Sequence, residues 1–151
     1  MKWAIILIGV FGIIALSLKA AMDTGEKSPK FVGGHIHLPE NLLEKSRGMS
    51  TLFVVIYDLD SKMPMPYGAV KFRLKEPPKA GNFYPFVITR ERLQIMAGET
   101  APAPKRMRVK ARLDKDGIAG MDQPGDLTGE IKEVAFGADN VEIRLARLVG
   151  S

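Results

Sequence analysis

The chain has 151 residues, of which 46% are hydrophobic and 26% charged, and it contains no cysteine. The lack of cysteine excludes disulfides, thiol catalysis, cysteine-ligated zinc and covalent haem attachment. Of the 22 basic residues, Lys2 and Lys19 precede the first acidic residue, Asp23, so 20 basic residues face 17 acidic ones in the remainder. This balance, and the absence of aromatic residues among the basic residues of the stretch 105–112, argue against a nucleic-acid-binding protein.

An uncharged apolar stretch runs from Trp3 to Leu18. A membrane-spanning helix needs about 20 apolar residues, and residues 3–22 supply this length if Lys19 extends its amine to the membrane surface. Cleavage after Ala21 would put Lys19 at the third position before the cut, where a small residue is expected. We therefore expect residues 1–22 to form a single transmembrane helix in the inner membrane, with a cleaved signal segment as the alternative. In both cases the rest of the chain is periplasmic.

Residues 23–32 are polar and turn-rich and predict a tether, and residues 33–149 predict one extracytoplasmic domain. Apolar and polar side chains alternate along this domain, or form short β-branched and aromatic runs, as is typical of strands. Residues 39–45 fit a short helical turn. The predicted strands are Phe31–Leu38, Thr51–Tyr57, Tyr67–Leu74, Phe83–Ile88, Met107–Leu113, Leu127–Val134 and Val141–Leu148. About seven strands without long helices between them predict an all-β, antiparallel β-sandwich.

Two pairs of side chains suit a metal ion. Both histidines, His35 and His37, fall on one face of the first predicted strand, about 6.6 Å apart along the chain. Met63 and Met65 offer thioethers, which are soft ligands for Cu(I). Histidine on a strand and methionine in a Pro-rich loop also serve ordinary packing, so a periplasmic copper-binding protein that uses these four residues is the alternative function.

No arrangement of residues predicts catalysis. Gly33-Gly34 lacks the pattern of a phosphate-binding loop. The carboxylate pairs Asp58/Asp60 and Asp114/Asp116 follow strands, where Asp commonly accepts hydrogen bonds from the nearby backbone. We therefore expect a protein that is not an enzyme and carries no cofactor.

Two phrases stand out by their order and spacing. The first is Met63-Pro64-Met65-Pro66 followed by Ala69-Val70-Lys71, and the second is Gln123-Pro124-Gly125-Asp126-Leu127-Thr128-Gly129. Over about residues 33 to 148 the chain resembles the C-terminal extracytoplasmic domain of cytochrome c-type biogenesis proteins of the CcmI/CycH family. The resemblance implies an immunoglobulin-like sandwich in a membrane protein that helps bring apocytochrome c to the haem-ligation machinery.

Members of that family usually carry two membrane helices and a tetratricopeptide-repeat region before this domain, whereas here one apolar segment joins it directly. Because the repeat region is associated with gripping apocytochrome, that activity is not transferred. We expect a membrane-anchored accessory or assembly protein of c-type cytochrome biogenesis, or of a respiratory membrane complex, that binds a protein partner. Exposed methionine adapts its shape to apolar peptides. The expected partner-binding residues are Met63, Pro64, Met65, Pro66, Pro124 and Asp126.

Overall fold

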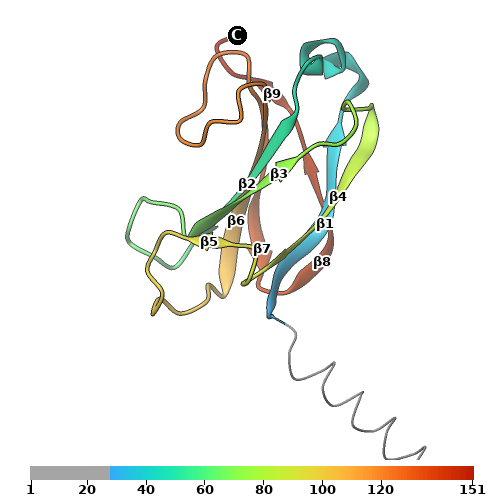
Figure 1. Ribbon diagram of the computed structural model, residues 1–151. Helices are drawn as coiled ribbons and strands as arrows, with labels where there is room; N and C mark the ends of the chain where they lie inside the picture. The colour runs from blue at the N-terminus through green and yellow to red at the C-terminus, as the bar shows by residue number, and fades with distance from the viewer. Residues whose placement is uncertain (1–27) are drawn as a thin grey trace, which may run out of the picture.

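The computed structural model describes residues 28–151 as two β-sheets packed face to face (Figure 1). All seven predicted strand segments form strands, and the predicted helical turn forms two short 3-10 turns, which confirms the all-β sandwich. The elements in chain order are β1 (Lys30–Leu38), η1 (Glu40–Leu42), η2 (Glu44–Ser46), β2 (Thr51–Asp58), β3 (Gly68–Arg73), β4 (Gly81–Thr89), β5 (Gln94–Ile95), β6 (Arg106–Asp114), β7 (Leu127–Ala135), β8 (Ala138–Arg144) and β9 (Arg147–Leu148).

One sheet has the strand order β4-β1-β8 and the other β5-β3-β2-β6-β7-β9. The expectation of a wholly antiparallel sandwich is wrong for one pair, because β1 and β8 run parallel. The reason lies in the turn after β7. There the backbone N–H of Gly137 donates to the carbonyl of Phe31 at 2.7 Å, so β8 starts beside the first residues of β1 and runs in the same direction.

The predicted strand Val141–Leu148 is divided into β8 and β9, because the chain changes sheets between them. The N–H of Leu145 donates to the carbonyl of His37 in the three-stranded sheet, and the next N–H, of Ala146, donates to Thr128 in the six-stranded sheet. At this crossing the backbone of β7 lies in close contact with the backbone at the end of β8. A Cβ atom on Gly129 would lie 1.9 Å from the carbonyl oxygen of Arg144, so only glycine fits there.

The core lies between the sheets, and the side chains that enter it alternate along the strands as predicted. Ile36 and Leu38 on β1 are completely buried, whereas His35 points outward. Phe31 and Val32 are also buried. The strand therefore begins at Lys30, two residues before the predicted end of the tether at residue 32, because these two apolar side chains already belong to the core.

The sandwich has two ends, which we name after the chain termini (Figure 1). The N-terminal end consists of segments 28–30, 59–67, 90–105 and 136–137, and the C-terminal end of segments 39–50, 74–80, 115–126 and 145–151. Backbone N–H groups of Arg90 and Glu91 donate to the carbonyl of Pro29 and to Ser28 Oγ, so the chain joins the domain at its N-terminal end.

The predicted transmembrane helix, residues 1–22, lies outside the described residues. Between residues 28 and 151 no helix is long and apolar enough to cross a membrane.

Candidate functional site

The two loops expected to bind a partner lie at opposite ends of the sandwich. The loop with Met63, Pro64, Met65 and Pro66 follows β2 at the N-terminal end, whereas Pro124 and Asp126 precede β7 at the C-terminal end. Thr51 at the start of β2 pairs with Asp114, and Asp58 at its end pairs with Met107. The eight residues of β2 therefore separate the two loops by roughly 23 Å, and no single surface contains both.

The segment around Pro124 and Asp126 stabilises the fold. Gly125 donates its N–H to the carbonyl of Val149 at 2.9 Å, and Val149 donates to the carbonyl of Asp126 at 2.8 Å. The carboxylate of Asp126 accepts a hydrogen bond from the backbone N–H of Gln123 at 2.8 Å. These contacts hold the last residues of the chain against the start of β7, so the polar groups of this turn are used within the protein.

The methionine loop borders a shallow hollow at the N-terminal end. The side chains of Met63 and Met65 are 63% and 46% exposed. The hollow measures about 310 Å³ and is also lined by Asp58, Ser61, Tyr67, Ala97, Ala101 and Pro102. The Tyr67 ring is buried below it. The loop thus presents flexible apolar side chains to the outside.

The four candidate copper ligands are not brought together. His35 and His37 project from the outer face of the three-stranded sheet, where His37 Nδ1 lies 2.9 Å from Asn82 Oδ1. Met63 and Met65 belong to a loop of the other sheet. Across the described part of the chain, no cluster of three or more His, Asp or Glu side chains is suited to a metal ion. The geometry therefore gives the copper alternative no support.

The carboxylate pairs in the turns have the structural role expected for them. Asp58 Oδ1 accepts a hydrogen bond from the N–H of Asp60, and Asp114 Oδ1 accepts one from Gly117, both at 2.9 Å. Asp60 also binds Arg106, and this hydrogen bond lowers the pKa of the Asp60 carboxyl below its ordinary value.

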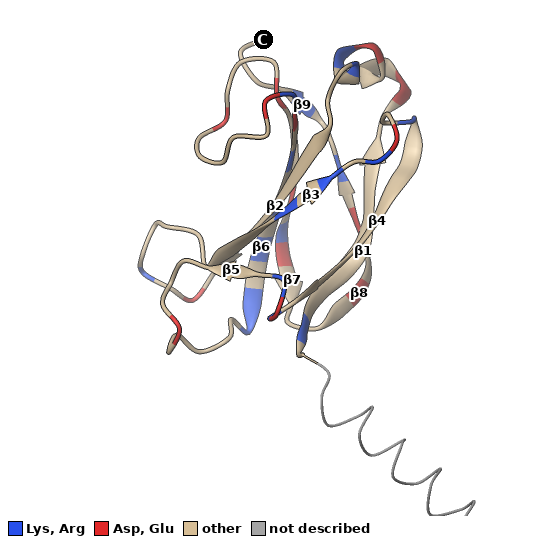
Figure 2. Ribbon diagram, in the orientation of Figure 1, with Lys and Arg blue, Asp and Glu red and all other residues tan. Residues whose placement is uncertain are grey.

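The basic residues of β6 alternate with core residues, and Figure 2 marks the basic positions along this strand. Arg106 binds Asp60 and Glu133, and Arg108 binds Glu130 at 2.7 Å. Lys110 pairs with Asp122. The prediction of a polar outward strand face is therefore confirmed for the first part of β6.

Arg112 is the exception, because it is buried although it lies on the outward face. Its guanidinium stacks on the Phe53 ring at 4.6 Å and donates to the carbonyls of Gly120 and Ile118. Arg112 Nε lies 3.3 Å from Asp114 Oδ2 and 3.8 Å from Asp126 Oδ2. The alternation along β6 predicts that this side chain points outward. It is buried because loop 115–126 folds back across the sheet and covers it, and the alternation alone does not show this.

The buried Asp114 carboxyl makes stability depend on pH. Burial raises its pKa above the ordinary value, despite the opposing hydrogen bond from Gly117 and the charge of Arg112. A raised folded-state pKa stabilises the fold at low pH, and this contribution is lost as pH rises from the unfolded pKa through the folded one. Relative to the parent, Asp114→Asn should therefore gain stability as pH rises through this window. Denaturant unfolding of both proteins at several pH values measures the difference, and a pH-independent difference would contradict it.

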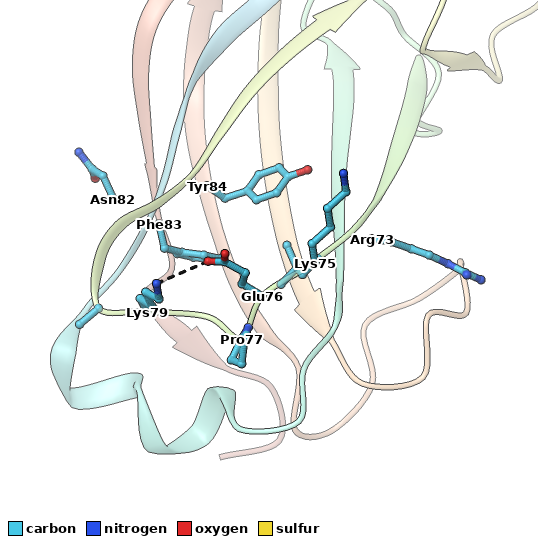
Figure 3. A pocket seen from close by; sticks show the side chains of 10 residues that line it. Arg73, Lys75, Glu76, Pro77, Lys79, Asn82, Phe83 and Tyr84 are labelled. Carbon is cyan, nitrogen blue, oxygen red and sulfur yellow. Dashed lines mark hydrogen bonds and ion pairs between the residues drawn. The ribbon is translucent and has the colours of Figure 1, made fainter.

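A larger groove lies at the C-terminal end, where the loop between β3 and β4 spans the open side of the sandwich (Figure 3). It encloses about 500 Å³. Phe83 and Tyr84 contribute aromatic rings, with Phe72 5.5 Å behind the Tyr84 ring. The residues that define this aromatic groove are Arg73, Lys75, Glu76, Lys79, Phe83 and Tyr84.

The rim of the aromatic groove carries three basic side chains and one acidic one. Glu76 lies 3.5 Å from Lys79, so this carboxylate is already paired, whereas Lys75 and Arg73 extend on the other side of the loop (Figure 3). Aromatic rings beside cations suit an apolar segment that also carries carboxylates. Sequence reasoning missed this groove, because its residues form no motif and the groove arises where the loop between β3 and β4 crosses from one sheet to the other.

Comparison with known proteins found no matching family model, no matching curated protein and no matching solved structure.

Proposed function

We propose that this protein is a membrane-anchored periplasmic accessory protein of c-type cytochrome biogenesis or of a respiratory membrane complex. It acts by binding a protein partner, without catalysis or a cofactor, through an immunoglobulin-like sandwich. The main support is the placement of the phrase 123–129 in the fold. Gln123 to Asp126 form the turn that holds the C-terminus, Leu127 enters the core, and Gly129 permits the crossing of β8 to the other sheet. The phrase that carries the family resemblance thus consists of residues on which this sandwich depends.

The aromatic groove is the surface best suited to the partner. It lies at the C-terminal end of the sandwich, opposite the end at which the N-terminal segment joins. An anchored protein would therefore present it away from the bilayer, toward periplasmic parts of other membrane proteins. A partner segment with apolar and acidic residues would place its apolar side chains on Phe83 and Tyr84 and its carboxylates near Lys75.

Loss of the aromatic groove should reduce c-type cytochrome maturation. We expect the double variant Lys75→Glu with Phe83→Ser to bind the partner at least about 30-fold more weakly, the loss of one hot-spot interaction of 2 kcal/mol. In a strain of the native organism that carries only this variant, haem-stained c-type cytochromes should fall toward the level of a strain lacking the gene.

Lys132→Glu is the matched control, since Lys132 is an exposed lysine on β7 away from the groove. It should restore wild-type cytochrome levels at equal protein abundance. The proposed role in cytochrome biogenesis would be refuted if the strain lacking the gene matured its c-type cytochromes and assembled its respiratory complexes normally.

A further inference from the structure

Exposed apolar side chains gather at the N-terminal end of the sandwich. Besides Met63 and Met65, this end exposes Leu59, Met96 and Phe136, with exposed fractions between 37% and 43%. We call these five residues the apolar rim. They come from three different connections between strands, namely 59–67, 96–105 and 136–137.

Hydrogen bonds between these connections hold the apolar rim together. The N–H of Met96 donates to the carbonyl of Tyr67 at 2.8 Å, beside the methionine loop. Leu59 and Phe136 donate to the carbonyls of Arg106 and Lys105, two neighbouring residues at the start of β6. The rim is therefore a fixed feature of one end of the fold.

The same end receives the chain from the apolar N-terminal segment. The segment between the predicted anchor and β1, residues 23–29, can span at most about 25 Å even when fully extended. If residues 1–22 are anchored in the membrane, as the proposed function requires, this reach keeps the N-terminal end close to the bilayer surface. No comparable constraint acts on the opposite end.

We propose that the apolar rim contacts the bilayer surface, with its methionine side chains inserted between lipid headgroups. Unbranched methionine side chains adapt to such an irregular environment. Lys62 and Lys105 flank the rim and can extend their amines to the headgroups. Charges of both signs are mixed at this end, so we assign the contact to the apolar side chains rather than to attraction by anionic lipid. The basic residues are Lys30, Lys62, Arg90, Arg92 and Lys105, and the acidic ones are Asp60, Glu91 and Glu99. The contact would orient the aromatic groove away from the membrane.

Single-cysteine labelling of the full chain tests this contact, because the natural sequence has no cysteine. The variants Met63→Cys and Met96→Cys carry an environment-sensitive fluorophore, and the chain is reconstituted into neutral phosphatidylcholine vesicles. Met121→Cys is the control, since Met121 is 86% exposed at the C-terminal end. We expect blue-shifted emission and quenching by headgroup-proximal spin-labelled lipid at positions 63 and 96, and neither effect at position 121. The signals should persist at high salt.

A fourth variant, Ile8→Cys, reports separately on the anchor. A label at position 8 that is protected by lipid, combined with labels at 63 and 96 that are as exposed to water as the label at 121, would overturn the rim contact and leave the anchor intact. A label at position 8 that is exposed to water would overturn both. Quenching at 63 and 96 that requires anionic lipid or low salt would also overturn the proposed apolar contact.

Discussion

Replacing Gly34 by alanine should destabilise the domain by more than about 4 kcal/mol, a loss that is exceptional for a single substitution. Gly34 pairs with Val141 where β1 and β8 run side by side. A Cβ atom on Gly34 would lie 1.9 Å from the carbonyl oxygen of Val141 and 2.7 Å from its carbonyl carbon. The obstacle is backbone, so no side-chain rotation relieves it, and the parallel pairing of β1 with β8 must open. Urea unfolding followed by circular dichroism measures the loss.

The preceding glycine provides the matched control. A Cβ atom on Gly33 would lie 3.4 Å from Asp139 Oδ1 and 3.5 Å from the carbonyl of Phe86, which is ordinary contact. Gly33→Ala should therefore change stability by less than about 1 kcal/mol, since alanine also costs less backbone entropy than glycine in a strand. Equal effects of the two substitutions would show that β8 does not approach β1 as described.

Replacing Arg112 by methionine should cost about 3–5 kcal/mol, the usual loss when one partner of a buried ion pair is removed. Methionine can still cover the Phe53 ring, but it cannot neutralise Asp114 and Asp126 or donate to the carbonyls of loop 115–126. The substitution should therefore lower the stability of the fold and also loosen loop 115–126. Thermal unfolding reports the loss of stability, and faster tryptic cleavage after Lys115 reports the loosening of the loop.

Arg47→Met is the control for Arg112, because Arg47 is exposed and, within residues 28–151, forms an ion pair with Glu44 alone. Such a surface pair contributes at most about 1 kcal/mol. Adding Asp114→Asn to Arg112→Met should recover part of the lost stability, since it removes one of the uncompensated buried charges. If Arg112→Met were no more damaging than Arg47→Met, loop 115–126 would not depend on the buried arginine.

The two ends of the sandwich suggest a division of roles. The N-terminal end carries the apolar rim and the junction with the apolar segment, and the C-terminal end carries the aromatic groove. In the proposed arrangement, the rim positions the domain on the bilayer and the groove receives the partner. The groove variant and the rim labels test these roles independently, because they alter opposite ends of the molecule.

Local sequence pattern was sufficient to predict the long strands, but it missed the two-residue strand β5 and joined β8 to β9. Alternation of apolar and polar residues, as in residues 107–113, reports directly which side chains face a core, and glycine, proline and aspartate mark the turns between strands. The turn role of Asp58 and Asp114 was also predictable, because an aspartate side chain hydrogen-bonds to backbone only a few residues away.

Features that depend on contacts distant along the chain were not predictable in this way. The parallel pairing of β8 with β1, the burial of Arg112 and the separation of the methionine loop from Pro124 all follow from where the strands lie beside one another. The aromatic groove is lined by the contiguous residues 73–84, but it also depends on the fold, because β3 and β4 belong to different sheets. Periodicity describes one strand at a time, whereas the order and direction of strands depend on the packing of the whole core.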